Sequence, residues 1–155
     1  MLVVAQRVSR ASVTVEGDVV GQIGRGLCLL ACALEGDVDE DVLWLADKCI
    51  DLRVFPDARG LTNLSLLDVG GEVLLVSQFT LAADWRKGRR PSFVRAAPPS
   101  EGERLLRVFA ERLVERGASV AQGRFGALME VALVNDGPFT LVLDGAQRRR
   151  SGASS

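Results

Sequence analysis

The first 34 residues constrain the fold more than any other part of the chain. They consist of short apolar or alternating stretches separated by one or two polar or glycine residues, which is the spacing of β-strands joined by tight turns. The expected strands are Val3–Val8, Ser12–Glu16, Val19–Ile23 and Leu27–Leu34. Gly17-Asp18 is a two-residue hairpin signal. Because such short turns join antiparallel neighbours, the chain is expected to begin with an antiparallel sheet.

Helical periodicity follows in two later segments. Apolar residues recur at helical spacing over Val38–Asp51, with Asp37 as the expected cap, and over Glu101–Arg116, between the cap Ser100 and the stop Gly117. Further strands are expected at Leu52–Phe55, Val73–Phe79, Met129–Val134 and Phe139–Leu143.

Together these elements predict an α+β fold, with mostly antiparallel strands in two sheets rolling toward a barrel and two helices packed outside. A chain of 155 residues, 48% of them apolar, suits one domain, expected at residues 1–146. Residues 147–155 are expected to form a disordered basic and polar tail. The longest apolar run is too short to cross a membrane and the start does not resemble a signal peptide, so a cytoplasmic protein is expected.

The residues that are missing restrict the chemistry. The chain has no histidine, which excludes serine-histidine hydrolases, zincins and histidine-based nucleases, and it has no phosphate-binding glycine motif. Its three cysteines lie in apolar patterns without a paired zinc motif, which predicts buried reduced thiols. Catalysis would therefore depend on carboxylates, hydroxyls, backbone dipoles or a group of the substrate, with no metal and no cofactor.

Positive charge is concentrated in two clusters. One contains Arg86, Lys87, Arg89 and Arg90, and the other contains Arg148, Arg149 and Arg150. Without these seven residues the chain has 12 basic and 20 acidic side chains. This distribution favours a local anion site on an acidic body, or else solvated charged loops, and gives no sign of a DNA-binding domain.

Polar residues end or interrupt apolar strands at two places. Ser77-Gln78-Phe79-Thr80 ends one strand, where hydroxyls and successive N–H groups could form an oxyanion site or simply terminate the strand. Gly137-Pro138 lies between two expected strands, and because proline has no N–H for a ladder this step must be a turn or a bulge. A cis bond is possible there, although an ordinary turn is the simpler interpretation of the residues alone.

These segments, in this order, resemble the D-aminoacyl-tRNA deacylase family, the chiral proofreading enzymes. The resemblance is carried by Ser77–Thr80, Arg86–Phe93, Gly123–Gly126 and Asn135–Thr140, with support from Val4–Val15 and Asn63–Gly71. It is nearly collinear from residue 1 to about residue 144. The departures from the family pattern are Ala82 for tyrosine, Trp85 for a small polar residue, Leu61-Thr62 for a longer or basic pair, and Phe139 for valine.

The resemblance implies a homodimer that hydrolyses the ester of D-aminoacyl-tRNA, and also glycine mischarged on tRNA. The carbonyl groups of Gly137 and Pro138 from one subunit, joined by a cis bond and braced by Arg7, would form a wall in the active site of the other subunit. An L side chain would collide with that wall.

The resemblance also implies the catalytic set Ser77, Gln78, Phe79 and Thr80. Backbone N–H groups of Phe79 and Thr80 would stabilise the oxyanion, and the terminal ribose hydroxyl would position or activate water. Thr80 as nucleophile is the rival mechanism.

Phe125 and Met129 would line an adenosine pocket, although Met129 is also suited to the core. Arg86, Lys87, Arg89 and Arg90 would contact tRNA phosphates. Two other functions remain open. One is a non-catalytic module that binds the tRNA acceptor end, and the other is a trans-editing deacylase for mischarged L-aminoacyl-tRNA, which predicts a trans Gly137-Pro138 bond.

Overall fold

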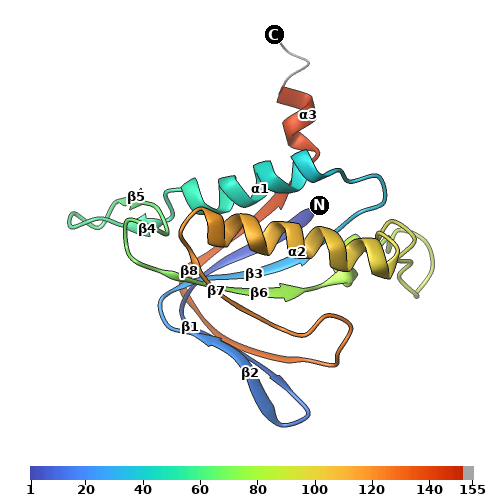
Figure 1. Ribbon diagram of the computed structural model, residues 1–155, viewed down its shortest axis with the longest axis horizontal. Helices are drawn as coiled ribbons and strands as arrows, with labels where there is room; N and C mark the ends of the chain where they lie inside the picture. The colour runs from blue at the N-terminus through green and yellow to red at the C-terminus, as the bar shows by residue number, and fades with distance from the viewer. Residues whose placement is uncertain (152–155) are drawn as a thin grey trace.

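A six-stranded sheet forms the centre of the computed structural model, which describes residues 1–151 (Figure 1). Its strands are β1 (Leu2–Val15), β2 (Asp18–Ile23), β3 (Gly26–Cys32), β6 (Glu72–Ser77), β7 (Ser119–Gln122) and β8 (Glu130–Asp144). A small second sheet pairs β4 (Phe55–Pro56) with β5 (Thr62–Leu64). The helical elements are α1 (Asp39–Asp51), the 3-10 helix η1 (Phe79–Ala82), α2 (Pro99–Glu115) and α3 (Gln147–Ser151).

The large sheet curls into a nearly closed barrel. Its order is β2-β1-β3-β6-β7, with β8 along β1, and β1 pairs antiparallel with β2, β3 and β8. The edges approach where Gly21 of β2 meets β7, because a Cβ at Gly21 would lie 2.8 Å from the carbonyl oxygen of Gln122. The expected α+β barrel is confirmed. The parallel pairs β3–β6 and β6–β7 were not expected.

Two apolar cores lie on opposite faces of the sheet. Helices α1 and α2 cover one face (Figure 1), and the core between them includes Leu29, Leu75 and Phe109. The second core lies inside the curled sheet and includes Val13, Cys28 and Leu74. Because β3 and β6 are buried on both faces, their sequences read as continuous apolar runs rather than alternating ones.

The long strands β1 and β8 correct two predictions. Each was expected as two shorter strands, yet both run without interruption, and the pairing absorbs the irregular residues as bulges. The short strands β5 and β7 were not predicted.

The N-cap residues predicted for α1 and α2 are both wrong. Val38 is the cap residue of α1, while the Asp37 carboxylate accepts a hydrogen bond from the Leu34 N–H at 2.7 Å and pairs with the N-terminal amine. Helix α2 begins at Pro99, so Ser100 lies inside its first turn. The stop at Gly117 is confirmed, since α2 ends at Glu115 and the Gly117 N–H bonds the Val114 carbonyl oxygen.

The C-terminal segment also differs from its prediction. Residues Gln147–Ser151 form α3, where disorder was expected, and the remaining residues of that expected tail, 152–155, lie outside the described residues. Arg148 and Arg149 of α3 both contact the carboxylate of Asp41, which is fully buried on α1. None of the described helices is long and apolar enough to cross a membrane.

Candidate active site

The end of β6 and the start of η1 present free backbone donors. The Gln78 N–H bonds the Ala31 carbonyl oxygen at 2.8 Å, which keeps the chain beside β3 one residue beyond β6. The chain then turns into η1, whose first N–H groups belong to Phe79 and Thr80. The opening N–H groups of a helix have no partner inside it. Among the described residues neither group donates a hydrogen bond, so both are available to an oxyanion.

The Thr80 hydroxyl is held by an amide rather than by a base. Gln78 Nε2 donates a hydrogen bond to Thr80 Oγ1. An amide nitrogen cannot accept the proton that a threonine nucleophile must lose. Phe79 lies beside them, and its ring meets that of Phe93 edge to face, with 5.1 Å between the centroids.

A groove of about 790 Å³ opens beside these residues. Ser77, Gln78 and Phe79 line it, whereas Thr80 does not. Residues 93, 94 and 96–99 and the first two turns of α2 also line the groove, and sequence reasoning had not assigned them to the site. Its volume is within the range of small-molecule sites.

The groove offers little acid-base chemistry. Its titratable side chains are Cys32 and Glu35. Burial raises the pKa of the Cys32 thiol, which lies against the carbonyl oxygens of Ala33 and Phe79. Cys28 and Cys49 lie in the two cores, where burial raises their pKa values to about 11 and about 12. All three cysteines are free and buried, as predicted, and within residues 1–151 no cluster of acidic or cysteine side chains is placed to hold a metal ion.

Phe125 and Met129 enter the same groove from the segment before β8. Phe125 keeps 38% of its surface exposed, whereas Met129 also packs against the second core. Gly123 permits this arrangement, because a Cβ there would lie 2.6 Å from the Met129 sulfur. Met129 therefore belongs both to the groove and to the edge of the second core, and its role toward adenosine stays a prediction.

Gly137 and Pro138 lie on a bulge of β8, joined by a cis peptide bond. Gln6 pairs with Thr140 and Val8 with Asn135, so residues 136–139 stand opposite a single residue of β1. Gly137 and Pro138 are exposed and do not line the groove of their own chain. The trans bond required by the L-specific alternative is not present.

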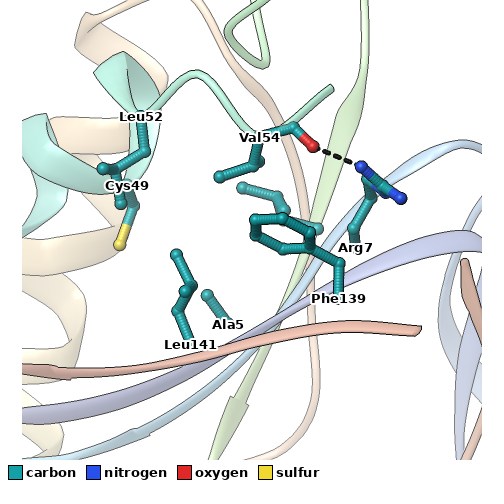
Figure 2. Close-up of a pocket in the computed structure, with 8 residues that line it drawn as sticks. Ala5, Arg7, Cys49, Leu52, Val54, Phe139 and Leu141 are labelled. Carbon is teal, nitrogen blue, oxygen red and sulfur yellow. Dashed lines mark hydrogen bonds between the residues drawn. The ribbon is translucent and has the colours of Figure 1, made fainter. Parts of the chain in front are cut away.

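The Arg7 side chain braces this bulge through contacts with Asp136 and Phe139. Its Nε donates to the Asp136 carbonyl oxygen at 3.0 Å, its guanidinium lies 4.9 Å from the Phe139 ring centroid, and its Nη1 donates to the Val54 carbonyl oxygen. Figure 2 shows the Phe139 ring beside the Arg7 side chain; both line a small cavity together with Val54 and Leu141. Gly137 has a φ of 131°, and a Cβ there would lie 2.7 Å from Arg7 Nη2, so glycine suits both the conformation and the space.

Asn135 closes the bulge from inside β8. Its Oδ1 accepts from the Phe139 N–H at 2.8 Å, and its Nδ2 donates to the Phe139 carbonyl oxygen at 3.3 Å and to Thr140 Oγ1 at 3.2 Å. The side chain thus replaces the strand partner that Phe139 lacks. Sequence reasoning gave Asn135 no role, although a side-chain amide beside a Gly-Pro step is the available signal.

The basic cluster lies on an exposed loop that follows η1. Arg86 forms a bidentate ion pair with Asp84, at 2.9 and 2.6 Å, and this contact lowers the pKa of the Asp84 carboxyl. Lys87, Arg89 and Arg90 are exposed. None of these side chains lines the groove, although the residues that follow the loop do.

Comparison with known proteins shows extensive similarity. The family model described as D-Tyr-tRNA(Tyr) deacylase matches residues 4–144. A D-aminoacyl-tRNA deacylase of Dinoroseobacter shibae is 57% identical, over 94% of this chain and 100% of that protein, and one from Dehalococcoides mccartyi is 55% identical, over 96% and 97%.

Two solved structures share the fold. One, described as "c-Myc DNA Unwinding Element Binding Protein", has a TM-score of 0.87 and 40% identity, covering 93% of this chain and 98% of that one. The other, described as "a probable eukaryotic D-amino acid tRNA deacylase", has a TM-score of 0.77 and 20% identity, covering 92% and 98%, and supports the fold alone.

Proposed function

Because the chain belongs to the D-Tyr-tRNA(Tyr) deacylase family, we propose that it is a chiral proofreading hydrolase that cleaves the ester of D-aminoacyl-tRNA. The products are a free D-amino acid and tRNA. The family match covers residues 4–144, and the observation that supports the activity is the groove, which brings Ser77, Gln78 and Phe79 together with Phe125 and Met129. We also propose residues 1–146 as a single deacylase domain.

In the proposed mechanism the ester carbonyl lies at the start of η1. The N–H groups of Phe79 and Thr80 stabilise the oxyanion, and the loss of one such donor typically costs about 2.7–4 kcal/mol. The neighbouring hydroxyl of the terminal ribose positions or activates water. The contact between Gln78 Nε2 and Thr80 Oγ1 supports this over a Thr80 nucleophile, because the threonine has no adjacent base.

The rest of the substrate would extend away from the ester. We propose that Phe125 and Met129 receive the terminal adenine by stacking and sulfur contact. Arg86, Lys87, Arg89 and Arg90 would contact phosphates of the acceptor end, in a salt-dependent way that does not read sequence. The Arg86 contribution is reduced by its ion pair with Asp84.

Selection of D-amino acids would require a second copy of the chain. Arg7 pairs with Leu27 at the start of β3, whereas Ala31, near the end of β3, lines the groove. Four residues of strand correspond to about 13 Å. The exposed Gly137-Pro138 step therefore suits the groove of a partner better than its own. We propose a cytoplasmic homodimer in which this wall excludes L side chains and admits D side chains and glycine.

The test is deacylation of D-Tyr-tRNA and L-Tyr-tRNA by the purified protein. We expect release of D-tyrosine and little release of L-tyrosine. Binding of tRNA without release of either amino acid would instead favour the non-catalytic binding module. Faster release of L-tyrosine would refute chiral proofreading.

A further inference from the structure

The backbone at Trp85 is held in place, whereas the Trp85 side chain is exposed. It keeps 76% of its surface exposed. Its neighbour Asp84 exchanges two backbone hydrogen bonds with Ser92, at 2.7 and 2.8 Å, which closes the base of the loop. Its other neighbour, Arg86, donates its N–H to Asp84 Oδ1 at 3.1 Å and forms the bidentate ion pair. The backbone on both sides is therefore held while the indole ring remains in solvent.

Uncompensated positive charge lies on the same loop as the ring. Arg86 is paired with Asp84, but no carboxylate of residues 1–151 forms an ion pair with Lys87, Arg89 or Arg90. An exposed aromatic ring on one loop with unpaired cations is a combination by which proteins bind single-stranded nucleic acid, because bases stack on the ring and phosphates meet the charges. An apolar partner surface would leave these charges desolvated and unpaired.

The loop leads directly into the mouth of the groove. Ser92, at the base of the loop, is followed by Phe93 and Val94, which line the groove. Phe93 also packs edge to face on Phe79. A chain that leaves the groove past this aromatic pair would therefore meet the loop next.

We propose that Trp85 is a stacking platform for an unpaired nucleotide that precedes the terminal adenosine of the substrate, with Lys87, Arg89 and Arg90 holding its phosphates. The proposal rests on the proposed function for the identity of the RNA. It adds a second binding point, outside the groove, that acts only on substrates longer than one nucleotide. Stacking needs only the flat face of a base, so the platform requires no hydrogen bonds to the base edge.

The test compares two substrates, D-Tyr-tRNA and D-tyrosyl-adenosine, which lacks all preceding nucleotides. Trp85→Ala is expected to lower kcat/KM for D-Tyr-tRNA by about 5- to 150-fold, the effect of losing one base-aromatic stack, and to leave D-tyrosyl-adenosine unchanged. Trp85→Phe should retain most of the activity, since phenylalanine keeps a flat ring. Val19→Ala removes another exposed apolar side chain, on β2, and should change neither substrate.

Three results would overturn the proposal. These are an unchanged kcat/KM for D-Tyr-tRNA in Trp85→Ala, an equal loss on both substrates, and dissociation of a dimer by Trp85→Ala, which would place the ring in a protein interface.

A binding assay separates this proposal from the proposed function. The chain has two tryptophans, so Trp44→Phe leaves Trp85 as the sole reporter. Titration with a short RNA that mimics the acceptor end should quench its fluorescence even if no ester is cleaved. Absence of quenching would refute stacking, whereas quenching without deacylation would refute only the enzymatic proposal.

Discussion

Replacing Asn135 by alanine should weaken chiral selection more than it weakens the fold. The substitution removes three hydrogen bonds, two of them to the backbone of Phe139 at 2.8 and 3.3 Å. Each is worth about 0.5–1.5 kcal/mol net, and the group is only partly buried, so the free energy of unfolding should fall by about 1–3 kcal/mol. The free energy of unfolding of a typical domain is about 5–15 kcal/mol, so the Asn135→Ala variant should remain folded.

The effect on selection follows from what those bonds hold. They close residues 136–139, which carry Gly137 and Pro138, while Arg7 braces the other side through Asp136. If the amide supplies about 1.4 kcal/mol of that support, a displaced wall becomes about ten times more populated. Cleavage of L-Tyr-tRNA should then rise by up to about tenfold, and cleavage of D-Tyr-tRNA should change by less than about threefold.

Single-turnover deacylation of both esters, with unfolding curves for each variant, measures this. Thr140→Val is the matched control, because it removes the hydroxyl that accepts from Asn135 Nδ2 and Gln6 Nε2 but leaves both bonds between Asn135 and Phe139. It should leave the ratio of the D and L rates within about twofold of the wild type, because both lost contacts are exposed and neither holds Phe139. An unchanged ratio in a folded Asn135→Ala variant would refute the role of the side chain in holding the wall.

Three further outcomes test the site and the fold. Thr80→Ala should retain activity within about tenfold, whereas a 2′-deoxy terminal ribose should suppress cleavage; loss of activity in the variant, or activity on the deoxy substrate, contradicts the proposed mechanism. At pH 8 iodoacetamide should modify at most Cys32 in the native protein, because burial raises the pKa of all three thiols and so lowers their thiolate fraction; mass spectrometry before and after denaturation checks this. Changing both Arg148 and Arg149 to alanine should lower the free energy of unfolding by about 1–3 kcal/mol, since the buried Asp41 carboxylate loses its partners; an unchanged urea midpoint would contradict it.

Sequence patterns predicted the strands, turns and helix ends that are determined by neighbouring residues in the chain. The apolar runs of β3 and β6 and the stop at Gly117 each depend on a few neighbouring residues, and the structure has them. The expected hairpin is also present, but its turn residues are Glu16 and Gly17, both with positive φ, whereas Asp18 already pairs with Val15. The parallel pairing of β6 with β3 depends on contacts more than 40 residues apart, which no local pattern contains.

The misread caps and strands have the same origin. Asp37 has the composition of a helix cap, but its carboxylate is occupied by the Leu34 N–H and the N-terminal amine. The break expected between the two halves of β8 does not occur, because Arg7 and Asn135 supply the hydrogen bonds that the bulged backbone lacks. A rule that predicts turns from local sequence cannot detect a hydrogen-bond partner on another strand, such as Arg7 on β1.

The part of the candidate site that is contiguous in the sequence could be predicted from it. Ser77 to Phe79 form one segment, and the family resemblance supplied Phe125 and Met129, which the fold brings into the same groove. The segment 93–99 is held at the groove by backbone hydrogen bonds to residues just beyond β3, from the Ala97 N–H to the Ala33 carbonyl oxygen and from the Glu35 N–H to the Arg95 carbonyl oxygen. Its part in the site therefore depended on tertiary structure.

The separation of the donors from the wall limits how selection can arise. The free N–H groups lie at η1, beyond the end of β6, whereas Gly137 and Pro138 lie on β8, across β1 from the start of β3. In the proposed mechanism, hydrolysis and discrimination depend on different residues of one chain and should be separable by substitution. A substitution near Phe139 should change the ratio of D to L cleavage with little effect on the oxyanion site, and a change at η1 should slow both esters equally. Such independence is expected only if the two parts meet across a subunit interface, since a wall built beside its own donors would shift together with them.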